Sequence, residues 1–266
     1  MKIHFIFRAD QSNVGDWWCP PFRYFNFRPA SVSDIYCLSD NLSDDDILII
    51  GGGGLGTEHF TPYLNFIKAK FQGTSIIWGA GIDTIVDKSG LLSAGEYDLY
   101  GDFFKGFTEV STRVFTSPLE HRYTPCSSCM HPSFDRYREL KPTSLIGVYQ
   151  HKRVHITLDS SYSWVPTMDN SGSNIDEKLH FLSKFEYIIT NTYHGVYWGT
   201  LLGRKIICLP FKSGLFSFKD TPQYCFDGHL SDDVFLNAKS YDFALEDARL
   251  ENISFYRYLT SKYDLV

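Results

Sequence analysis

The sequence has no long apolar run and no excess of basic residues, and each absence excludes a class of protein. No stretch of the 266 residues approaches the roughly 20 apolar residues that span a bilayer. The apolar stretch at the N-terminus, which Arg8 and Asp10 interrupt, is too short for a signal peptide. With 25 basic and 31 acidic residues, the net charge of −6 argues against a dedicated nucleic-acid binder. We therefore expect a cytoplasmic protein with no transmembrane segment and no nucleic-acid partner. Peripheral membrane association and the oligomeric state stay open.

The sequence lacks a full set of cysteine ligands, and the spacing of its six cysteines gives little support to a metal site. Of the six cysteines, only Cys126 and Cys129 are closely spaced, with His131 nearby. A structural zinc site normally needs four ligands from two such elements, and the sequence has no second pair. A redox pair is expected beside a strand–helix junction, whereas this one lies in a loop flanked by prolines. We expect reduced cysteines and no metal, and we favour loop packing for this pair without fixing its use.

Short apolar runs alternate with helical patterns along most of the chain. The helical patterns cover 61–71, 175–185 and, as a charged amphipathic segment, 241–263. Such alternation favours parallel sheets with helices over their faces. The runs expected to form strands are 2–7, 46–50, 74–78, 144–149, 154–158, 187–190 and 205–209.

Both halves of the chain have polar or glycine-rich loops where their strands end. This favours an α/β fold of two Rossmann-like, doubly wound domains that face a cleft, a glycosyltransferase-B-like plan. We place the N-terminal domain, on the acceptor side, at 1–142 and the C-terminal domain, on the donor side, at 143–240. Residues 241–266 are expected to form a helix that packs back on the body. A single open sheet of six or seven strands is the alternative.

The segment 185–211 is the most informative part of the sequence. An apolar strand ends at a polar loop, Asn191–Tyr193, and His194 and Gly195 then open a helix that closes at Gly203 before the next strand. Helix N-termini attract anions, and ligands of open α/β sheets collect beyond the carboxyl ends of the strands. The pattern therefore predicts a site with His194 as its titratable group, flanked by Asn191, Thr192, Tyr193 and Gly195. The alternative is a helix-capping histidine without a chemical role.

Two loops of the first half are candidates for the opposite wall of the cleft. Asn13-Val-Gly15-Asp16 follows the first strand, and Asp16 there is either a helix cap or a base toward a hydroxyl. Gly51-Gly52-Gly53-Gly54 follows another strand, so its backbone can approach a ligand closely. It is neither a P-loop nor a nicotinamide-binding motif, and a tight turn is the alternative.

Basic residues follow strands in the second half. Lys152 and Arg153, beside His151, come after the first strand of that half, and Lys212 comes after the strand at 205–209. If these basic side chains face the cleft, they can bind a carboxylate or a phosphate. A solvated basic turn is the alternative.

Four sequence segments, taken in their order along the chain, resemble the pattern of the polysaccharide pyruvyl transferase family. The corresponding segments are Asn13–Asp16, Leu48–Gly54, Trp78–Ile82 and Ile188–Pro210. The resemblance implies a two-domain enzyme without metal or cofactor that transfers the enolpyruvyl unit of phosphoenolpyruvate, its co-substrate, to a sugar or glycan-lipid acceptor. It also implies that His194 matches the active-site histidine and that Lys152 and Arg153 lie where a donor-binding basic residue is expected.

The sequence departs from that family at one position. Better-studied members carry an arginine two residues before the histidine, whereas this chain has Thr192. A hydroxyl does not replace a bidentate guanidinium contact. The charge then comes from Lys152, Arg153, Lys212 or Arg8, with Arg113 as an outside candidate, or the donor is not phosphoenolpyruvate.

The sequence as a whole predicts a pyruvyl transferase of surface polysaccharide or glycoconjugate biosynthesis. We expect His194 to act as the general acid and Asp16 as the base toward the acceptor. The aromatic rings of Trp17, Trp18 and Tyr193 are candidates for a sugar platform. The alternatives are a glycosyltransferase that uses a nucleotide sugar and a non-catalytic sugar-binding protein.

Overall fold

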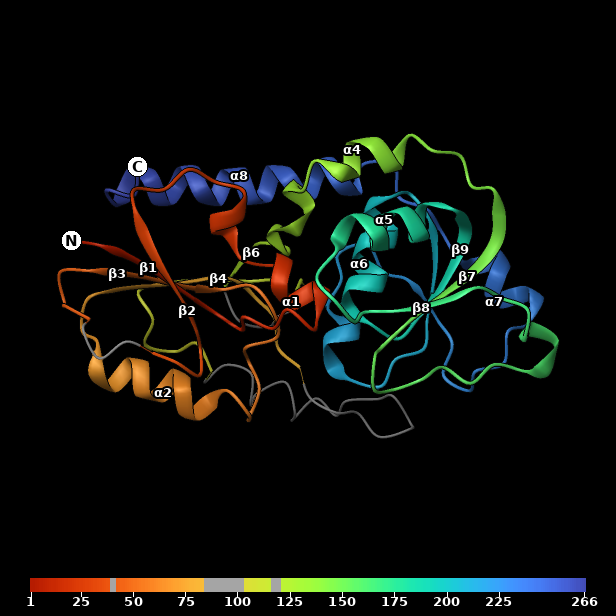
Figure 1. Cartoon of the computed structure of the whole chain (residues 1–266), viewed down its shortest axis with the longest axis horizontal. Coiled ribbons are helices and arrows are strands. Elements are labelled where there is room, and N and C mark those ends of the chain that lie inside the picture. The colour runs from red at the N-terminus through yellow and green to blue at the C-terminus, as the bar shows by residue number, and fades with distance from the viewer. Residues whose placement is uncertain (39–41, 84–102, 116–120) are drawn as a thin grey trace.

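The computed structural model describes residues 1–38, 42–83, 103–115 and 121–266 as an α/β fold with two parallel sheets (Figure 1). The order in the first sheet is β2 (Ala30–Asp34), β1 (Ile3–Phe7), β3 (Ile47–Gly51), β4 (Thr74–Ala80), β5 (Glu109–Thr112) and β6 (Arg122–Tyr123). The order in the second is β11 (Gln223–Tyr224), β10 (Lys205–Cys208), β9 (Phe185–Thr190), β7 (Ser144–Gln150) and β8 (Thr167–Asp169). The predicted parallel α/β arrangement is thus confirmed.

Helices cover the sheets and connect their strands. They are α1 (Val14–Trp18), α2 (Thr61–Lys70), α4 (Ser133–Arg138), α5 (Ile175–Ser183), α6 (Tyr193–Leu201), α7 (Asp232–Asn237) and α8 (Ala244–Lys262). In Figure 1, α2 lies on one side of the first sheet and α8 on the other. Among the described residues, no helix has both the length and the apolar character needed to cross a membrane.

The core of the first sheet follows the two-residue period of its strands. Leu48 and Ile50 of β3 pack with α2, whereas Ile47 and Ile49 pack on the face that receives α8. On that face Trp78 is fully buried and donates from Nε1 to Oδ1 of Asn252 in α8 over 3.1 Å. This hydrogen bond ties β4 to α8 close to the carboxyl end of the strand.

The last helix, α8, contacts the cores of both sheets. Ala244 and Ala248 near its start belong to the hydrophobic cluster of the second sheet, whereas Phe255 and Leu259 belong to a cluster of the first. Asn252, between them, donates to the backbone oxygen of Pro125 over 3.1 Å. The helix thus braces the two halves on the side away from α2.

The apolar run 154–158, expected as a strand, is not one. Two of its polar backbone groups are bound by side-chain amides rather than by a neighbouring strand. The amide of Ile156 donates to Oε1 of Gln150 over 2.9 Å, and the carbonyl of Val154 accepts from Nδ2 of Asn191 over 2.8 Å. The edge position beside β7 is taken by β8 instead. Residues 184 and 185, expected to continue helix α5, lie beyond its end, and Phe185 begins β9.

Candidate functional site

A cavity of about 140 Å³ lies where loops that follow strands of both sheets meet. Its walls come from both halves of the chain, as expected for ligand sites at the carboxyl ends of parallel strands. The first half contributes Arg8, Asn13, Asp16, Gly54, Leu55, Phe60, Asp83 and Arg113. The second half contributes His151, Asn170, Thr192, Tyr193, His194 and Lys212.

His194 lies in the first turn of α6 and is only 8% exposed. Its ring lies 4.7 Å from that of Trp198, and Nε2 is 3.4 Å from Sγ of Cys126. Burial, with the charges of Arg113 and Lys212, holds the pKa of His194 well below its ordinary value. The imidazole is therefore neutral near pH 7.

Gly15 allows α1 to approach this histidine. A Cβ atom at residue 15 would overlap Nδ1 of His194, so only glycine fits the contact. Gly15 does not line the cavity itself. Its effect is to bring the neighbouring Asp16 into the wall that faces His194.

Asp16 is held by the asparagine that caps the same short helix. Oδ1 of Asn13 accepts from the amide of Gly15 over 3.2 Å and from Nδ2 of Asn170 over 3.3 Å. The side-chain nitrogen Nδ2 of Asn13 therefore donates to Oδ2 of Asp16, over 2.7 Å. Burial raises the pKa of Asp16 in spite of the opposing Arg113 and Lys212 charges. The cavity thus pairs a carboxyl of raised pKa with an imidazole of lowered pKa.

Arg113 brings a buried cation into the cavity. It follows β5 directly, is 5% exposed, and its guanidinium carbon lies 3.6 Å from the centre of the Tyr193 ring. Among the described residues, Nη1 has no hydrogen-bond partner. Gly81 leaves room for this side chain, since a Cβ there would overlap the guanidinium. A buried guanidinium with an unused donor is suited to an anionic ligand.

Lys212 and Arg8 are also cations of the cavity, but each has a carboxylate partner. Lys212 Nζ pairs with Oδ2 of Asp83, whose Oδ1 accepts from the amide of Gly214 over 3.3 Å. Arg8 Nη1 pairs with Oδ2 of Asp34 at 2.5 Å. The Asp83–Lys212 pair joins the two halves at the cavity, and its lysine must leave or share the carboxylate in order to bind a ligand.

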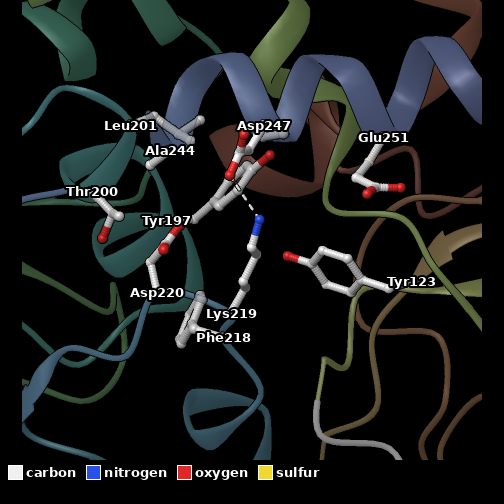
Figure 2. A pocket seen from close by; sticks show the side chains of 11 residues that line it. Tyr123, Tyr197, Thr200, Leu201, Phe218, Lys219, Asp220, Ala244, Asp247 and Glu251 are labelled. Carbon is white, nitrogen blue, oxygen red and sulfur yellow. Dashed lines mark hydrogen bonds and ion pairs between the residues drawn. The ribbon is translucent and has the colours of Figure 1, made fainter. Parts of the chain in front are cut away.

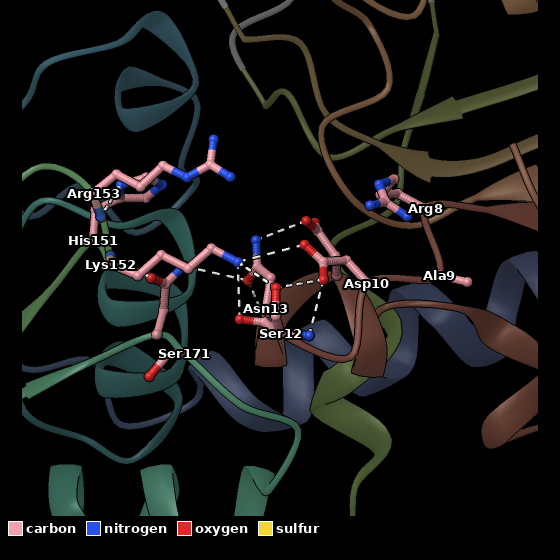
Figure 3. A network of polar contacts seen from close by, with 12 residues as sticks. Arg8, Ala9, Asp10, Ser12, Asn13, His151, Lys152, Arg153 and Ser171 are labelled. Atoms are coloured by element: carbon pink, nitrogen blue, oxygen red, sulfur yellow. Dashed lines mark hydrogen bonds and ion pairs between the residues drawn. The ribbon is translucent and has the colours of Figure 1, made fainter. Parts of the chain in front are cut away.

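Lys152 and Arg153 do not line the cavity. Lys152 Nζ donates to the backbone oxygen of Ser12 over 2.9 Å and to its Oγ over 2.8 Å, and it lies 3.4 Å from Oδ2 of Asp10. Figure 3 shows this network, with the exposed Arg153 pointing away from it. We call the Lys152 contacts with Asp10 and Ser12 the latch. The latch connects the loop before α1 to the second half.

The backbone next to the latch is joined as well. The amide of Val14 donates to the carbonyl of Asn170 over 3.2 Å, and that of Gly172 donates to the carbonyl of Ser12 over 3.2 Å. Nε1 of Trp18 donates to the carbonyl of Ser173 over 2.6 Å. The segment that carries Asn13 and Asp16 is therefore fixed to the half of the chain that carries His194.

The remaining residues predicted around His194 mostly shape the loop. Thr192 caps α6 by accepting from the amide of Gly195 over 2.8 Å, and it also lines the cavity. Asn191 does not: its Oδ1 accepts from the amide of His151 over 2.7 Å, which fixes the loop after β7. Gly195 packs against Thr190 and leaves no room for a Cβ.

The glycine run after β3 reaches the cavity only at its end. Gly54 lines it, and a Cβ there would lie 3.7 Å from Nη2 of Arg113. Gly52 and Gly53 have φ values of 76° and 75°, which favour glycine. A Cβ on Gly51 would overlap the carbonyl of Trp78. Gly51, Gly52 and Gly53 therefore form a tight turn that positions Gly54.

The rings proposed as a sugar platform are largely covered. Tyr193 lies between Arg113 and Phe218, whose ring centre is 4.8 Å away. Trp17 is covered by the guanidinium of Arg23 at 4.3 Å. Trp18 packs edge-on against His131 at 4.9 Å.

The Cys126–Cys129 segment is a buried turn with free thiols. Tyr197 donates to the carbonyl of Cys126 over 2.8 Å, and Arg249 donates to that of Cys129 over 3.0 Å. The turn thereby joins α6 to α8. Among the described residues, no group of three metal-binding side chains occurs.

A smaller hollow lies between α6 and α8 (Figure 2). It is lined by Tyr123, Asp220 and Glu251, and by Lys219, which pairs with Asp247 at 2.7 Å. Its volume of about 20 Å³ is close to that of a single water position, so it does not fit a substrate.

Sequence reasoning gave Arg113 too little weight and missed Asp83 and Asn170. Arg113 and Arg8 share a simple property, since each directly follows a strand of the first sheet. A search for charged residues at that position, which was applied to the second half, would have selected both. Asp83 lies three residues beyond β4 and is less readily found by this rule.

Comparison with known proteins does not identify a family. No protein-family model and no curated protein matches the chain. Similar solved structures include a functionally uncharacterised protein from Klebsiella pneumoniae, with 19% identity over 79% of this chain and 84% of that one, at a TM-score of 0.43. A variant of the wall teichoic acid polymerase TagF has 9% identity over 96% of this chain and 83% of that one, at a TM-score of 0.39. At these values neither likeness supports a functional argument.

Proposed function

We propose that the protein transfers a pyruvyl group from phosphoenolpyruvate to a sugar hydroxyl in surface polysaccharide or glycoconjugate biosynthesis, on a two-domain, glycosyltransferase-B-like plan. The observation that carries the proposal is Arg113, a buried guanidinium with an unused donor in the same cavity as His194. It provides the cation that the sequence lacks at Thr192. No metal or cofactor is required.

The size and charge of the cavity favour a small anionic donor. Pockets for drug-sized ligands are typically about 300–1,000 Å³, whereas this cavity measures about 140 Å³. Phosphoenolpyruvate carries a carboxylate and a phosphate, which match Arg113 and, after release from Asp83, Lys212. A nucleotide sugar is far larger, so the volume disfavours the main alternative donor.

The reaction needs one proton donor and one proton acceptor. Protonation of the methylene carbon of phosphoenolpyruvate makes C2 electrophilic, and an acceptor hydroxyl adds there as it loses its proton. A second hydroxyl then displaces phosphate and closes the ketal, and the leaving phosphate takes up the proton of that hydroxyl and departs as hydrogen phosphate. We assign the donor role to Asp16, whose pKa is raised, and the acceptor role to His194, whose pKa is lowered. This reverses the assignment made from the sequence.

Phosphate release tests the proposal. Wild-type protein is incubated with phosphoenolpyruvate and a panel of methyl hexopyranosides, and inorganic phosphate is measured with and without each sugar. We expect acceptor-dependent release, which Asp16→Asn abolishes without weakening phosphoenolpyruvate binding. Absence of acceptor-dependent phosphate across the panel would overturn pyruvyl transfer.

Thermal shifts separate the alternatives. Phosphoenolpyruvate should raise the melting temperature by mass action, whereas UDP-glucose should not. A shift with UDP-glucose alone would instead support a glycosyltransferase. Sugar binding with no turnover from either donor would support a non-catalytic sugar-binding protein.

A further inference from the structure

An aromatic cluster lies beside the cavity, in the loops after β2 and before α2. We call Tyr36, His59 and Phe60 the aromatic rim. The rings of Tyr36 and Phe60 are stacked with centres 5.7 Å apart, and those of His59 and Phe60 are edge-on at 4.9 Å. Phe60 lines the cavity, whereas Tyr36 is 38% exposed. The rim therefore runs from the cavity to the surface.

The rim carries polar groups at its edges. The hydroxyl of Tyr36 lies 2.5 Å from Nε2 of His59. Arg8, which lines the cavity, lies with its guanidinium carbon 4.7 Å from the centre of the Tyr36 ring. Asp34 fixes this arrangement by accepting from the amides of Ala9 and Tyr36 over 2.7 and 2.8 Å. Apolar ring surface with hydrogen-bonding edges matches the mixed surface of a sugar.

The cavity is electrostatically asymmetric. The Arg8 charge beside the rim is neutralised by Asp34 at 2.5 Å, whereas Nη1 of Arg113 is unpartnered among the described residues. An anion is therefore attracted to the Arg113 side, and an uncharged ligand fits the rim side. Asp16 lines the same cavity as Arg113 and Phe60.

We propose that the aromatic rim binds a pyranose ring of the acceptor and directs its hydroxyls toward Asp16 and His194. This inference rests on the proposed function and adds the place and chemical class of the acceptor subsite. The rings of Trp17, Trp18 and Tyr193 are contacted by other side chains, as described above. The Tyr36 ring is contacted as well, by Arg8 and Phe60, but at 38% Tyr36 is more exposed than those three residues, and it lies beside the cavity.

The test separates acceptor binding from donor binding. Tyr36→Ala and Phe60→Ala are compared with Tyr258→Ala, a control in α8 whose tyrosine is also 38% exposed and whose hydroxyl is also hydrogen-bonded, to Glu109. At saturating phosphoenolpyruvate we expect the acceptor KM to rise about ten-fold or more in both rim variants. The phosphoenolpyruvate KM of the rim variants should differ from the wild-type value by less than two-fold, as it should in the control variant. An unchanged acceptor KM in both folded rim variants overturns the inference.

A binding measurement makes this result independent of turnover. Saturation-transfer NMR with methyl β-D-glucopyranoside and methyl β-D-galactopyranoside is recorded on wild type, Tyr36→Ala and Tyr258→Ala without any donor. Loss of the sugar signal in Tyr36→Ala alone supports the rim even when phosphoenolpyruvate gives no phosphate, in which case only the proposed reaction fails. Equal signals in all three proteins, or no signal in wild type at millimolar sugar, count against the rim.

Discussion

The guanidinium carbon of Arg113 lies 3.6 Å from the centre of the Tyr193 ring, across the boundary between the two halves. Arg113 follows β5 in the first sheet, and Tyr193 begins α6 in the second half, directly before His194. A guanidinium therefore reaches the first residue of α6 through space, from a strand about 80 residues earlier in the chain, while Thr192 caps the helix. The positive charge at the start of α6 thus comes from Arg113 after β5, whereas the helix cap comes from Thr192 after β9.

Replacing this arginine should separate binding from stability. We expect Arg113→Met to weaken phosphoenolpyruvate binding by about ten-fold to a hundred-fold, the range for losing a charge-assisted hydrogen bond. The ligand-free variant should be at least as stable as wild type, because the substitution removes a buried charge whose Nη1 has no partner among the described residues. Melting temperatures with and without phosphoenolpyruvate measure both effects.

Arg8→Met is the matched control, since Arg8 lines the same cavity but is paired with Asp34. We expect this variant to lose stability, because Asp34 is left without its cation, and to keep most of its affinity for phosphoenolpyruvate. The opposite pattern, with affinity lost only in Arg8→Met, would move the donor anchor to Arg8.

The buried His194 should make stability depend on pH. Its pKa in the folded protein lies below that of the unfolded chain, so below about pH 6.5 the unfolded state binds a proton that the folded state does not. The stability it contributes is present at neutral pH and lost as the pH falls, by about 1.4 kcal/mol per pH unit. Urea unfolding between pH 7.5 and 5.5 should therefore show a smaller pH dependence in His194→Gln than in wild type. His155→Gln, at an exposed position, should behave as wild type, and identical slopes in all three proteins would contradict the assignment.

The sequence indicated which loops follow the strands but not the direction of their long side chains. The loops after β7 and β9 lie together because parallel strands of one sheet bring their carboxyl ends to one edge, and the loop after β1, in the other sheet, meets them at the cavity. Whether Lys152 turns toward the cavity or toward Ser12 depends on partners about 140 residues away. No local pattern encodes that choice.

Strands could be predicted from the sequence where burial produces a recognisable apolar pattern, and they could not be predicted where it does not. β3, buried at every position, was predicted within one residue. β2 was missed because its five residues, exposed or half-buried, form an edge strand without apolar alternation. The opposite error, a strand at 154–158, arose because an apolar run does not show that a neighbouring strand is free to pair with it.

The latch should affect turnover more than donor affinity. We expect Lys152→Met to lower kcat several-fold, because the segment carrying Asn13 and Asp16 loses its contacts with the second half, while the KM for phosphoenolpyruvate changes little. Arg153→Met removes the neighbouring exposed cation and should leave both constants unchanged. A ten-fold rise in KM at constant kcat for Lys152→Met would identify the lysine as a donor ligand, as the sequence suggested.

The contact between Gly15 and His194 offers a test of the site geometry itself. Because a Cβ at residue 15 would overlap the imidazole, Gly15→Ala should displace α1 or the ring, with a cost of about 1–3 kcal/mol in the free energy of unfolding and a loss of activity. Truncation of the ring removes the clash, so Gly15→Ala should cost much less stability in a His194→Ala background. The two substitutions are then non-additive in a double-mutant cycle, with a favourable coupling of about 1 kcal/mol or more. Additive effects would mean that α1 does not approach His194 in solution. The proposal that Asp16 and His194 act in the same cavity would then be wrong.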